Sequence, residues 1–202
     1  NQTRPPRPLR DVGRVIMKPA TSSLMFSSKT DEYRTPVDLF GQLDREFHFL
    51  LDAAAASNNH LCEWWFGPDH TSERNHDALR KPWAAIVRDW QFDDGSGAAI
   101  WLNPPYSRVD EFITKAAAES RAGATVVCLI PVRTDTAWWH REIWDSERHQ
   151  PRPGVQLRFL KGRLKFLLAG QDAKSANSAP FPSVVVVFRL WSIPIERIVS
   201  RA

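Results

Sequence analysis

The sequence predicts an α/β fold built around a largely parallel β-sheet. Short apolar runs alternate along the chain with segments of helical periodicity. Several of the runs are apolar throughout, which is typical of parallel strands buried on both faces of a sheet. Parallel strands also need helical connections between them, so the apolar runs and the alternation predict the same architecture.

The composition favours one globular domain preceded by a tail. The chain has 202 residues, of which 43% are hydrophobic and 25% are charged, and this length suits a single core. We expect residues 1–28 to form a flexible, basic, proline-rich tail, because prolines interrupt helices and the apolar content is too low for a core. Residues 29–202 would then form the folded domain.

The folded part is predicted to begin with a helix and a strand. Thr35 suits the N-cap and Pro36 the first helical position, and apolar residues follow at helical spacing. Residues 47–51 form a short apolar run that ends at Asp52. That run predicts a buried strand with a carboxylate directly after it.

The next segments predict loops between two further strands. The small residues 53–56 favour helix, and residues 61–66 predict a second strand. Residues 67–96 are polar and predict loops with one short helix. Residues 98–102 predict a strand that must stop at 103–106, because prolines cannot extend a central strand.

The second half of the sequence predicts two helices and four strands. The predicted helices are residues 110–121, ended by Gly123, and a segment from Thr134 or Asp135 through Trp144. The predicted strands are residues 125–130, ended by Pro131, then 155–159 and 163–168 around a turn at Lys161-Gly162, and finally 184–190.

Cysteine content and hydropathy exclude several classes of protein. No apolar run approaches the roughly 18 residues of a membrane-spanning helix, and no secretory signal is recognisable at the start. The two cysteines, Cys62 and Cys128, are too few for a disulfide framework or a cysteine-rich zinc site. We expect a cytoplasmic protein with no membrane partner and no metal.

Charge is unevenly distributed along the chain. Residues 1–20 hold five basic residues and one acid, whereas residues 31–80 hold ten acids and four bases. Residues 151–170 hold five bases and no acid. A cationic ligand is expected to prefer the acidic region and a polyanion the last one, although solvated surface charge would give the same pattern.

Three clusters of polar residues follow predicted strands. They are Asp52, residues 103–106 and residues 133–135. Ligands of open α/β sheets bind beyond the carboxyl ends of the strands. We therefore expect the three clusters to share one edge of the sheet and to form the site.

The motif Asn103-Pro104-Pro105-Tyr106 indicates chemistry at an amino group attached to an aromatic ring. Such an amine is a poor nucleophile, because its lone pair is delocalised into the ring. Asn103 offers a side-chain carbonyl and Pro104 a backbone carbonyl held by the ring of Pro105. Both can accept N–H hydrogen bonds and so localise the lone pair. Tyr106 offers a face on which a base can stack, once that base has left the duplex. A simple strand-ending turn would use the same residue types.

The sequence resembles the phage-type DNA N-6-adenine methyltransferases, the Dam-like family, over about residues 30–190. Six segments carry the resemblance, in this order: Thr35-Pro36, Asp52-Ala53-Ala54-Ala55, Asp77-Ala78-Leu79, Asn103-Pro104-Pro105-Tyr106, Pro131-Val132-Arg133-Thr134-Asp135-Thr136 and Gly162-Arg163-Leu164-Lys165-Phe166. The resemblance implies a Rossmann-like, S-adenosyl-L-methionine-dependent methyltransferase fold, with helices on both faces of a mostly parallel sheet. It also implies methylation of N6 of adenine in double-stranded DNA, by residues 103–106.

The resemblance also implies where the cofactor binds. Thr35 and Pro36 would lie near its methionine part, Asp52 with Ala53 and Ala54 would bind it at the end of the first strand, and Asp77 would accept from its adenine amino group. The sequence departs from the wider methyltransferase pattern, because no glycine closely follows Asp52. The alanines after Asp52 must therefore permit the close approach that glycine usually provides.

Five basic residues are candidates for contacts with DNA phosphates: Arg133, Arg158, Lys161, Arg163 and Lys165. In a strand, Arg163 and Lys165 would share one face. A solvated strand face is the alternative interpretation of the same pattern.

Two other functions stay open at this point. One is methyl transfer to another conjugated nitrogen, either cytosine N4 or a protein glutamine. The other is a non-catalytic DNA-binding module that uses the basic tail and residues 151–170. We expect the protein to act as a monomer or a homodimer.

Overall fold

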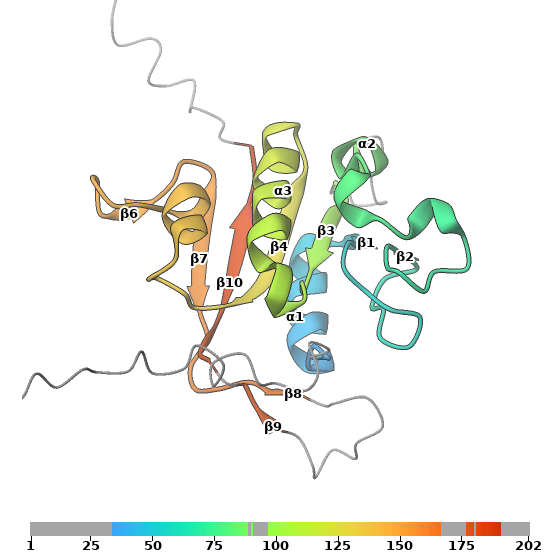
Figure 1. Ribbon diagram of the computed structural model, residues 1–202, viewed down its shortest axis with the longest axis horizontal. Coiled ribbons are helices and arrows are strands. Elements are labelled where there is room, and N and C mark those ends of the chain that lie inside the picture. The colour runs from blue at the N-terminus through green and yellow to red at the C-terminus, as the bar shows by residue number, and fades with distance from the viewer. Residues whose placement is uncertain (1–33, 89, 91–96, 167–176, 180, 191–202) are drawn as a thin grey trace, which may run out of the picture.

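A six-stranded sheet forms the centre of the computed structural model, which describes residues 34–88, 90, 97–166, 177–179 and 181–190 (Figure 1). Its strand order is β2-β1-β3-β4-β10-β7. The strands are β1 (Phe49–Asp52), β2 (Trp64–Trp65), β3 (Ala99–Leu102), β4 (Thr125–Pro131), β7 (Val155–Phe159) and β10 (Ser183–Phe188). The predicted tail, residues 1–28, lies outside the described residues.

The sheet is mostly parallel, as the sequence predicts. Strands β2, β1, β3 and β4 pair in parallel. Strand β10 lies antiparallel between β4 and β7. Strand β7 therefore runs in the same direction as β4, and the carboxyl ends of five strands share one edge.

Helices cover both faces of the sheet. Alternate residues of β3 point to opposite faces, because side chains alternate along a strand. Trp101 packs in one cluster with Leu43 of α1 (Val37–Phe47). Ile100 packs in the other cluster with Ile113 of α3 (Val109–Arg121) and with α2 (Trp83–Val87). The predicted Rossmann-like arrangement of layers is confirmed.

Short elements fill the connections between these layers. The 3₁₀ helices are η2 (Glu73–Asn75), η3 (Ala78–Arg80) and η4 (Tyr106–Arg108), and η5 (Trp139–Ile143) is a π-helix. Two small antiparallel pairs are β5 (Trp144–Asp145) with β6 (Gln150–Pro151), and β8 (Lys165–Phe166) with β9 (Asn177–Ser178).

The first helix differs from the prediction at its start. Helix α1 begins at Val37, Pro36 occupies the N-cap position, and no side chain caps it. The prediction of Thr35 as N-cap was wrong, because the Thr35 hydroxyl bonds Asn103 instead. Helix α1 also extends through Phe47, so the following strand starts only at Phe49.

The region after β1 contains less regular structure than predicted. Residues 53–56 form no helix, because tertiary partners take their backbone N–H groups: Ala53 donates to the Trp101 carbonyl and Ala55 to that of Phe66, each at 2.9 Å. The strand predicted over 61–66 is reduced to the two residues of β2. The short helix predicted within 67–96 is α2, and residues 89 and 91–96 lie outside the described residues.

The second half follows the prediction more closely. Helix α3 and strands β4, β7 and β10 form where they are predicted, although β10 ends at Phe188. Gly123 takes a φ of +106° directly after α3, a conformation that glycine accommodates at little cost. The helix predicted through Trp144 ends at Ile143, because Trp144 pairs in β5. Strand β8 begins only at Lys165, so Arg163 precedes it, and residues 167–168 are not described.

Two further observations concern membrane-spanning helices and the cysteines. Across the part of the chain that the structure describes, no helix is both long and apolar enough to traverse a bilayer. Cys62 and Cys128 are free and buried, and burial raises the pKa of each thiol.

Candidate active site

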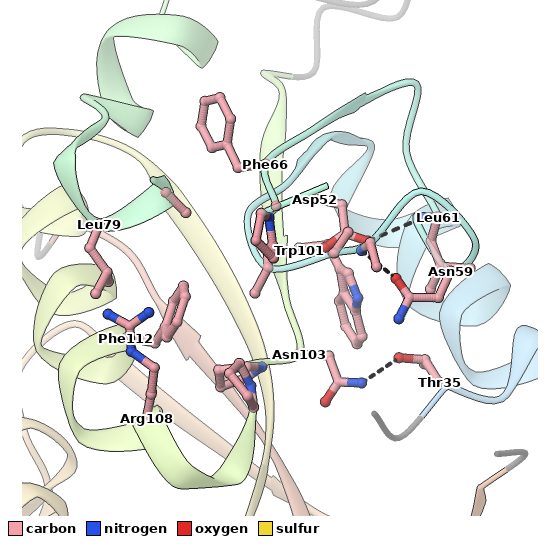
Figure 2. A pocket seen from close by; sticks show the side chains of 18 of the residues that line it. Thr35, Asp52, Asn59, Leu61, Phe66, Leu79, Trp101, Asn103, Arg108 and Phe112 are labelled. Carbon is pink, nitrogen blue, oxygen red and sulfur yellow. Dashed lines mark hydrogen bonds between the residues drawn. The ribbon is translucent and has the colours of Figure 1, made fainter. Parts of the chain in front are cut away.

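A cavity of about 310 Å³ lies beyond the carboxyl ends of β1 and β3 (Figure 2). Seven residues that the sequence singles out line it: Thr35, Asp52, Ala54, Asp77, Asn103, Pro104 and Pro105. Pro36, Ala53 and Tyr106 are not among the lining residues. The cavity thus brings together distant segments, such as Thr35 and Asn103, which are 68 positions apart in the sequence.

Strand β3 positions the Asn-Pro-Pro turn. All four residues of β3 are buried, and Asn103 is the first residue after the strand. Pro104 is buried and lacks the N–H that a further ladder bond would need. Tyr106 begins η4 and is half-buried. The strand end therefore places the Asn103 side chain and the backbone of Pro104 at the cavity.

The Asn103 amide contacts a residue from the start of the described chain. Its Nδ2 donates to the Thr35 hydroxyl at 3.1 Å, and Thr35 is buried, with 8% of its surface exposed. Helix α1, which follows Thr35, packs on β3: the Phe40 ring meets that of Trp101 edge-on at 5.5 Å. This contact holds Thr35 next to the strand end that carries Asn103.

Asp52 supplies a buried carboxylate to the cavity. Only 3% of its surface is exposed, and its oxygens accept from the backbone N–H of Leu61 at 3.1 Å and of Ala54 at 3.4 Å. Burial raises the pKa of Asp52 to about 6, although these two hydrogen bonds lower it in part. At neutral pH most of the Asp52 carboxylate is ionised, so it contributes a negative charge to a cavity whose lining also contains Arg34 and Arg108.

The loop after Asp52 forms the rest of this side of the cavity. Besides Leu61 and Ala54, the Ala56 N–H donates to the Asn59 side chain at 2.6 Å. Gly67 packs so tightly that a Cβ there would lie 1.9 Å from the Ala55 carbonyl oxygen. The backbone N–H groups of four lining residues, Ala54, Ala55, Ala56 and Leu61, are thus engaged within the protein.

Charged pairs surround the remaining side of the cavity. Asp77 is half-exposed and pairs with Arg80 at 3.1 Å. Arg108 pairs with Glu111 at 2.8 Å, and its guanidinium lies 5.7 Å from the centre of the Phe112 ring. Asp77, Arg108 and Phe112 all line the cavity.

None of the five predicted phosphate contacts lines the cavity. Arg133 follows β4, stacks on the Phe181 ring at 5.1 Å and approaches Asp135 at 3.5 Å. Arg158 makes a bidentate pair with Glu46 of α1, at 2.6 and 2.5 Å. The guanidinium also lowers the pKa of Glu46.

The other three lie beyond the end of β7. Lys161 and Arg163 are exposed in the turn after that strand, and Lys165 begins β8. The arrows of β3 and β7 in Figure 1 point toward the same end of the molecule, where the β8–β9 pair also lies. The residues around 161–165 therefore belong to the same edge of the sheet as the cavity, but not to its lining.

Sequence reasoning did not single out several lining residues. They include Asn59, Leu61, Phe66, Arg108 and Phe112. Phe112 lies on the buried side of α3, and its apolar periodicity would have identified that side. Asn59 and Arg108 belong to loops and turns whose direction no local pattern predicts.

The arrangement combines an amide, a rigid proline backbone and a buried carboxylate in one cavity. Such a set can bind a cationic ligand and accept hydrogen bonds from an amine. Among the residues that the structure describes, no group of three or more His, Cys, Asp or Glu side chains is placed to hold a metal ion.

The fold and site define a Rossmann-like α/β protein with a ligand cavity: a mostly parallel six-stranded sheet with one antiparallel strand, and a cavity beyond its carboxyl edge. A family model described as "DNA N-6-adenine-methyltransferase (Dam)" matches residues 22–202. The chain therefore belongs to the Dam family of DNA N-6-adenine methyltransferases.

A relative from Escherichia phage T1 has the same description. This chain is 27% identical over 168 residues to the "DNA N-6-adenine-methyltransferase" of that phage. The matched region covers 79% of this chain and 63% of the phage protein.

Proposed function

We propose that the protein transfers a methyl group from S-adenosyl-L-methionine to N6 of adenine in double-stranded DNA. The observation that carries the proposal is one cavity lined both by Asn103 and Pro104 and by the buried carboxylate of Asp52. Family membership supplies the reaction class, and the cavity supplies groups suited to its two reactants.

The lining residues fit S-adenosyl-L-methionine. The cofactor carries positive charge, for which the Asp52 carboxylate is a suitable partner inside a poorly solvated cavity. Leu61, Phe66 and Leu79 offer apolar surface to a purine ring. The volume of about 310 Å³ lies within the range of about 300–1,000 Å³ that small-molecule sites occupy. When bound, the cofactor supplies a methyl group on an electrophilic sulfonium.

Individual cofactor contacts follow the roles expected from the family. Thr35 and Pro36 would lie near the methionine part, and Asp52 with Ala54 would hold its charged portion. Ala53 is fully buried and would act only through the backbone that joins these two residues. Asp77 would accept from the adenine amino group, and it lines the cavity on the side of Leu79. Arg80, which pairs with Asp77, leaves this carboxylate partly neutralised.

The target adenine would enter beside Asn103. The Asn103 side-chain carbonyl and the Pro104 backbone carbonyl would accept the two N–H bonds of the amine, which directs its lone pair away from the ring. Pro105 keeps the Pro104 carbonyl in place, and Tyr106 would stack on the base. No strong general base is needed, since the proton can leave to water after the methyl group is transferred.

DNA would contact the edge of the sheet around the cavity. Arg133, Lys161, Arg163 and Lys165 would neutralise phosphates there, and Arg158 could do so only by releasing Glu46. The protein would act as a monomer or homodimer in the cytoplasm of a prokaryotic or phage-infected cell. Either phage self-protection or restriction–modification would use this activity.

The test is transfer of a labelled methyl group from S-adenosyl-L-methionine to double-stranded DNA. The digest should contain labelled N6-methyladenine, and sequencing of plasmid DNA from expressing cells should locate the modified adenines. Label on cytosine N4 or on a protein glutamine would assign a different acceptor. Salt-sensitive DNA binding without any heat of cofactor binding in calorimetry would indicate a non-catalytic DNA-binding module instead.

A further inference from the structure

We propose that Thr35 is a positioning residue for Asn103: its hydroxyl anchors the nitrogen end of the asparagine amide, so that the oxygen end is left to face the acceptor amine. The inference rests on the proposed function, because it concerns the same amine. It differs from the role that the family resemblance implies for Thr35, which is proximity to the methionine part of the cofactor.

The contact that carries the inference joins two lining residues of the cavity. Asn103 Nδ2 donates to Thr35 Oγ1 at 3.1 Å, and Thr35 is 8% exposed, so little water competes for the hydrogen bond. Figure 2 shows the amide nitrogen turned toward Thr35 and the carbonyl oxygen on the side away from it. Thr35 thus holds the nitrogen end of the amide.

The orientation of this amide decides whether the reaction can proceed. The two ends of an asparagine amide have nearly the same shape, but the oxygen accepts hydrogen bonds and the NH₂ group donates them. An acceptor amine must donate its N–H to an oxygen. A reversed amide would set two donors against each other and would leave the lone pair of the amine in the ring.

Thr35 is itself held firmly enough to anchor the amide. A residue before proline is confined to extended conformations, and Pro36 follows it. The Pro36 carbonyl accepts from Phe40 at 3.1 Å, which starts α1. Phe40 packs edge-on against Trp101, which is fully buried and lies two residues before Asn103. One packing unit therefore carries both partners of the hydrogen bond.

The experiment compares Thr35→Val, which has a similar shape but no hydroxyl, with Thr35→Ser, which keeps the hydroxyl. With both substrates saturating, Thr35→Val should lower kcat about tenfold, the equivalent of one lost hydrogen bond. The KM for S-adenosyl-L-methionine should stay within about twofold. Thr35→Ser should keep kcat within about threefold of the wild type. The matched control is Thr114→Val on the exposed face of α3, which should change neither constant.

A second measurement reads the amide without needing activity. The ¹⁵N side-chain resonance of Asn103, identified by its loss in Asn103→Ala, should show slow hydrogen exchange in the wild type and in Thr35→Ser. Exchange should accelerate about tenfold in Thr35→Val. If the wild type methylates no adenine, the proposed function fails, while this measurement still decides the role of Thr35.

Three results would overturn the inference. An unchanged kcat in Thr35→Val would show that the amide is oriented by other groups. A raised KM for the cofactor with a normal kcat would show that Thr35 contacts the cofactor and does not position Asn103. Equal defects in the serine and valine variants, with an unaltered Asn103 resonance, would reduce its role to packing.

Discussion

The cavity has two walls that are built in different ways. The turn wall consists of Thr35 and residues 103–105, and the loop wall consists of Asp52 and the lining residues between 54 and 68. The turn wall follows a strand buried in the middle of the sheet and contains two prolines. The loop wall has little regular structure and is held by hydrogen bonds, two of which go to the Asp52 carboxylate.

This difference indicates which kinetic or binding constant each wall is expected to affect. In the proposed reaction, the groups that would meet the reacting amine lie on the turn wall, where sheet packing determines their positions. Groups that would attract the charged cofactor lie on the loop wall, where one buried carboxylate organises the chain. Substitutions in the turn wall should therefore change kcat, and substitutions in the loop wall should change affinity.

The largest expected effect is that of Asn103→Ala on the turn wall. We expect kcat to fall at least 100-fold, because a preorganised polar partner of the reacting group is typically worth about 10²–10³ in rate. Affinity for S-adenosyl-L-methionine, measured by calorimetry, should change less than about threefold. Comparable losses in kcat and in cofactor affinity would contradict the assignment of catalysis to the turn wall and of cofactor binding to the loop wall.

Asp52→Asn should give the next largest effect, which we expect on the affinity for S-adenosyl-L-methionine. The folded-state pKa of about 6 lies above the ordinary value of 3.8, so the carboxylate gains a proton as pH falls through 6. Wild-type affinity for the cationic cofactor should therefore fall as pH drops below 6 and should level off about tenfold lower once Asp52 is protonated. The variant should bind about tenfold more weakly at pH 8 and should show no such pH dependence. Calorimetry from pH 5 to 8 measures both, and a wild-type profile without a change near pH 6 would contradict the role of Asp52.

Gly67→Ala should disturb the loop wall, to which Gly67 belongs. The added Cβ would meet the Ala55 carbonyl oxygen at 1.9 Å, so the backbone must move. We expect a loss of about 1–3 kcal/mol in the free energy of unfolding, with severalfold weaker cofactor binding and kcat within about twofold. Gly97→Ala, where a Cβ would meet nothing within 4 Å, is the control. Urea denaturation and calorimetry on both variants give the comparison.

The smallest effects belong to the basic residues outside both walls. Arg163→Ala should weaken DNA binding about two- to fivefold and lower the salt slope of log K by about one. Arg158→Ala should change DNA binding less, because Arg158 already pairs with Glu46. Fluorescence anisotropy at several salt concentrations would rank them, and a larger effect of Arg158 would place DNA along α1 instead.

The sequence predicts the sheet well because its strands are buried and apolar. Residues 125–130 and 184–188 have few alternatives to a central strand, and the structure places them side by side in β4 and β10. The errors occur where tertiary contacts override local preference. Thr35 has the side chain of an N-cap but bonds Asn103, and residues 53–56 suit a helix but bond β3 and the residue after β2.

The sequence predicts those residues of the candidate site that directly follow a predicted strand. Asp52 and Asn103 each close a predicted strand, and parallel strands bring their ends to one edge. Asn59, Arg108 and Phe112 reach the same cavity from a loop, a 3₁₀ helix and a long helix. Their approach depends on how those connections fold back on the sheet, which no residue pattern around them encodes.

The position of β10 determines when the sheet can be completed during synthesis of the chain. All six of its residues are buried, and it separates β4 from β7, which precede it in the sequence. While the ribosome is still making residues 160–180, β4 is an apolar edge strand whose backbone groups on the β10 side have no partner strand. The nascent protein must keep that edge from pairing with other chains until its last described strand emerges. Truncation before residue 183 would leave the edge open permanently, and such products should aggregate rather than fold.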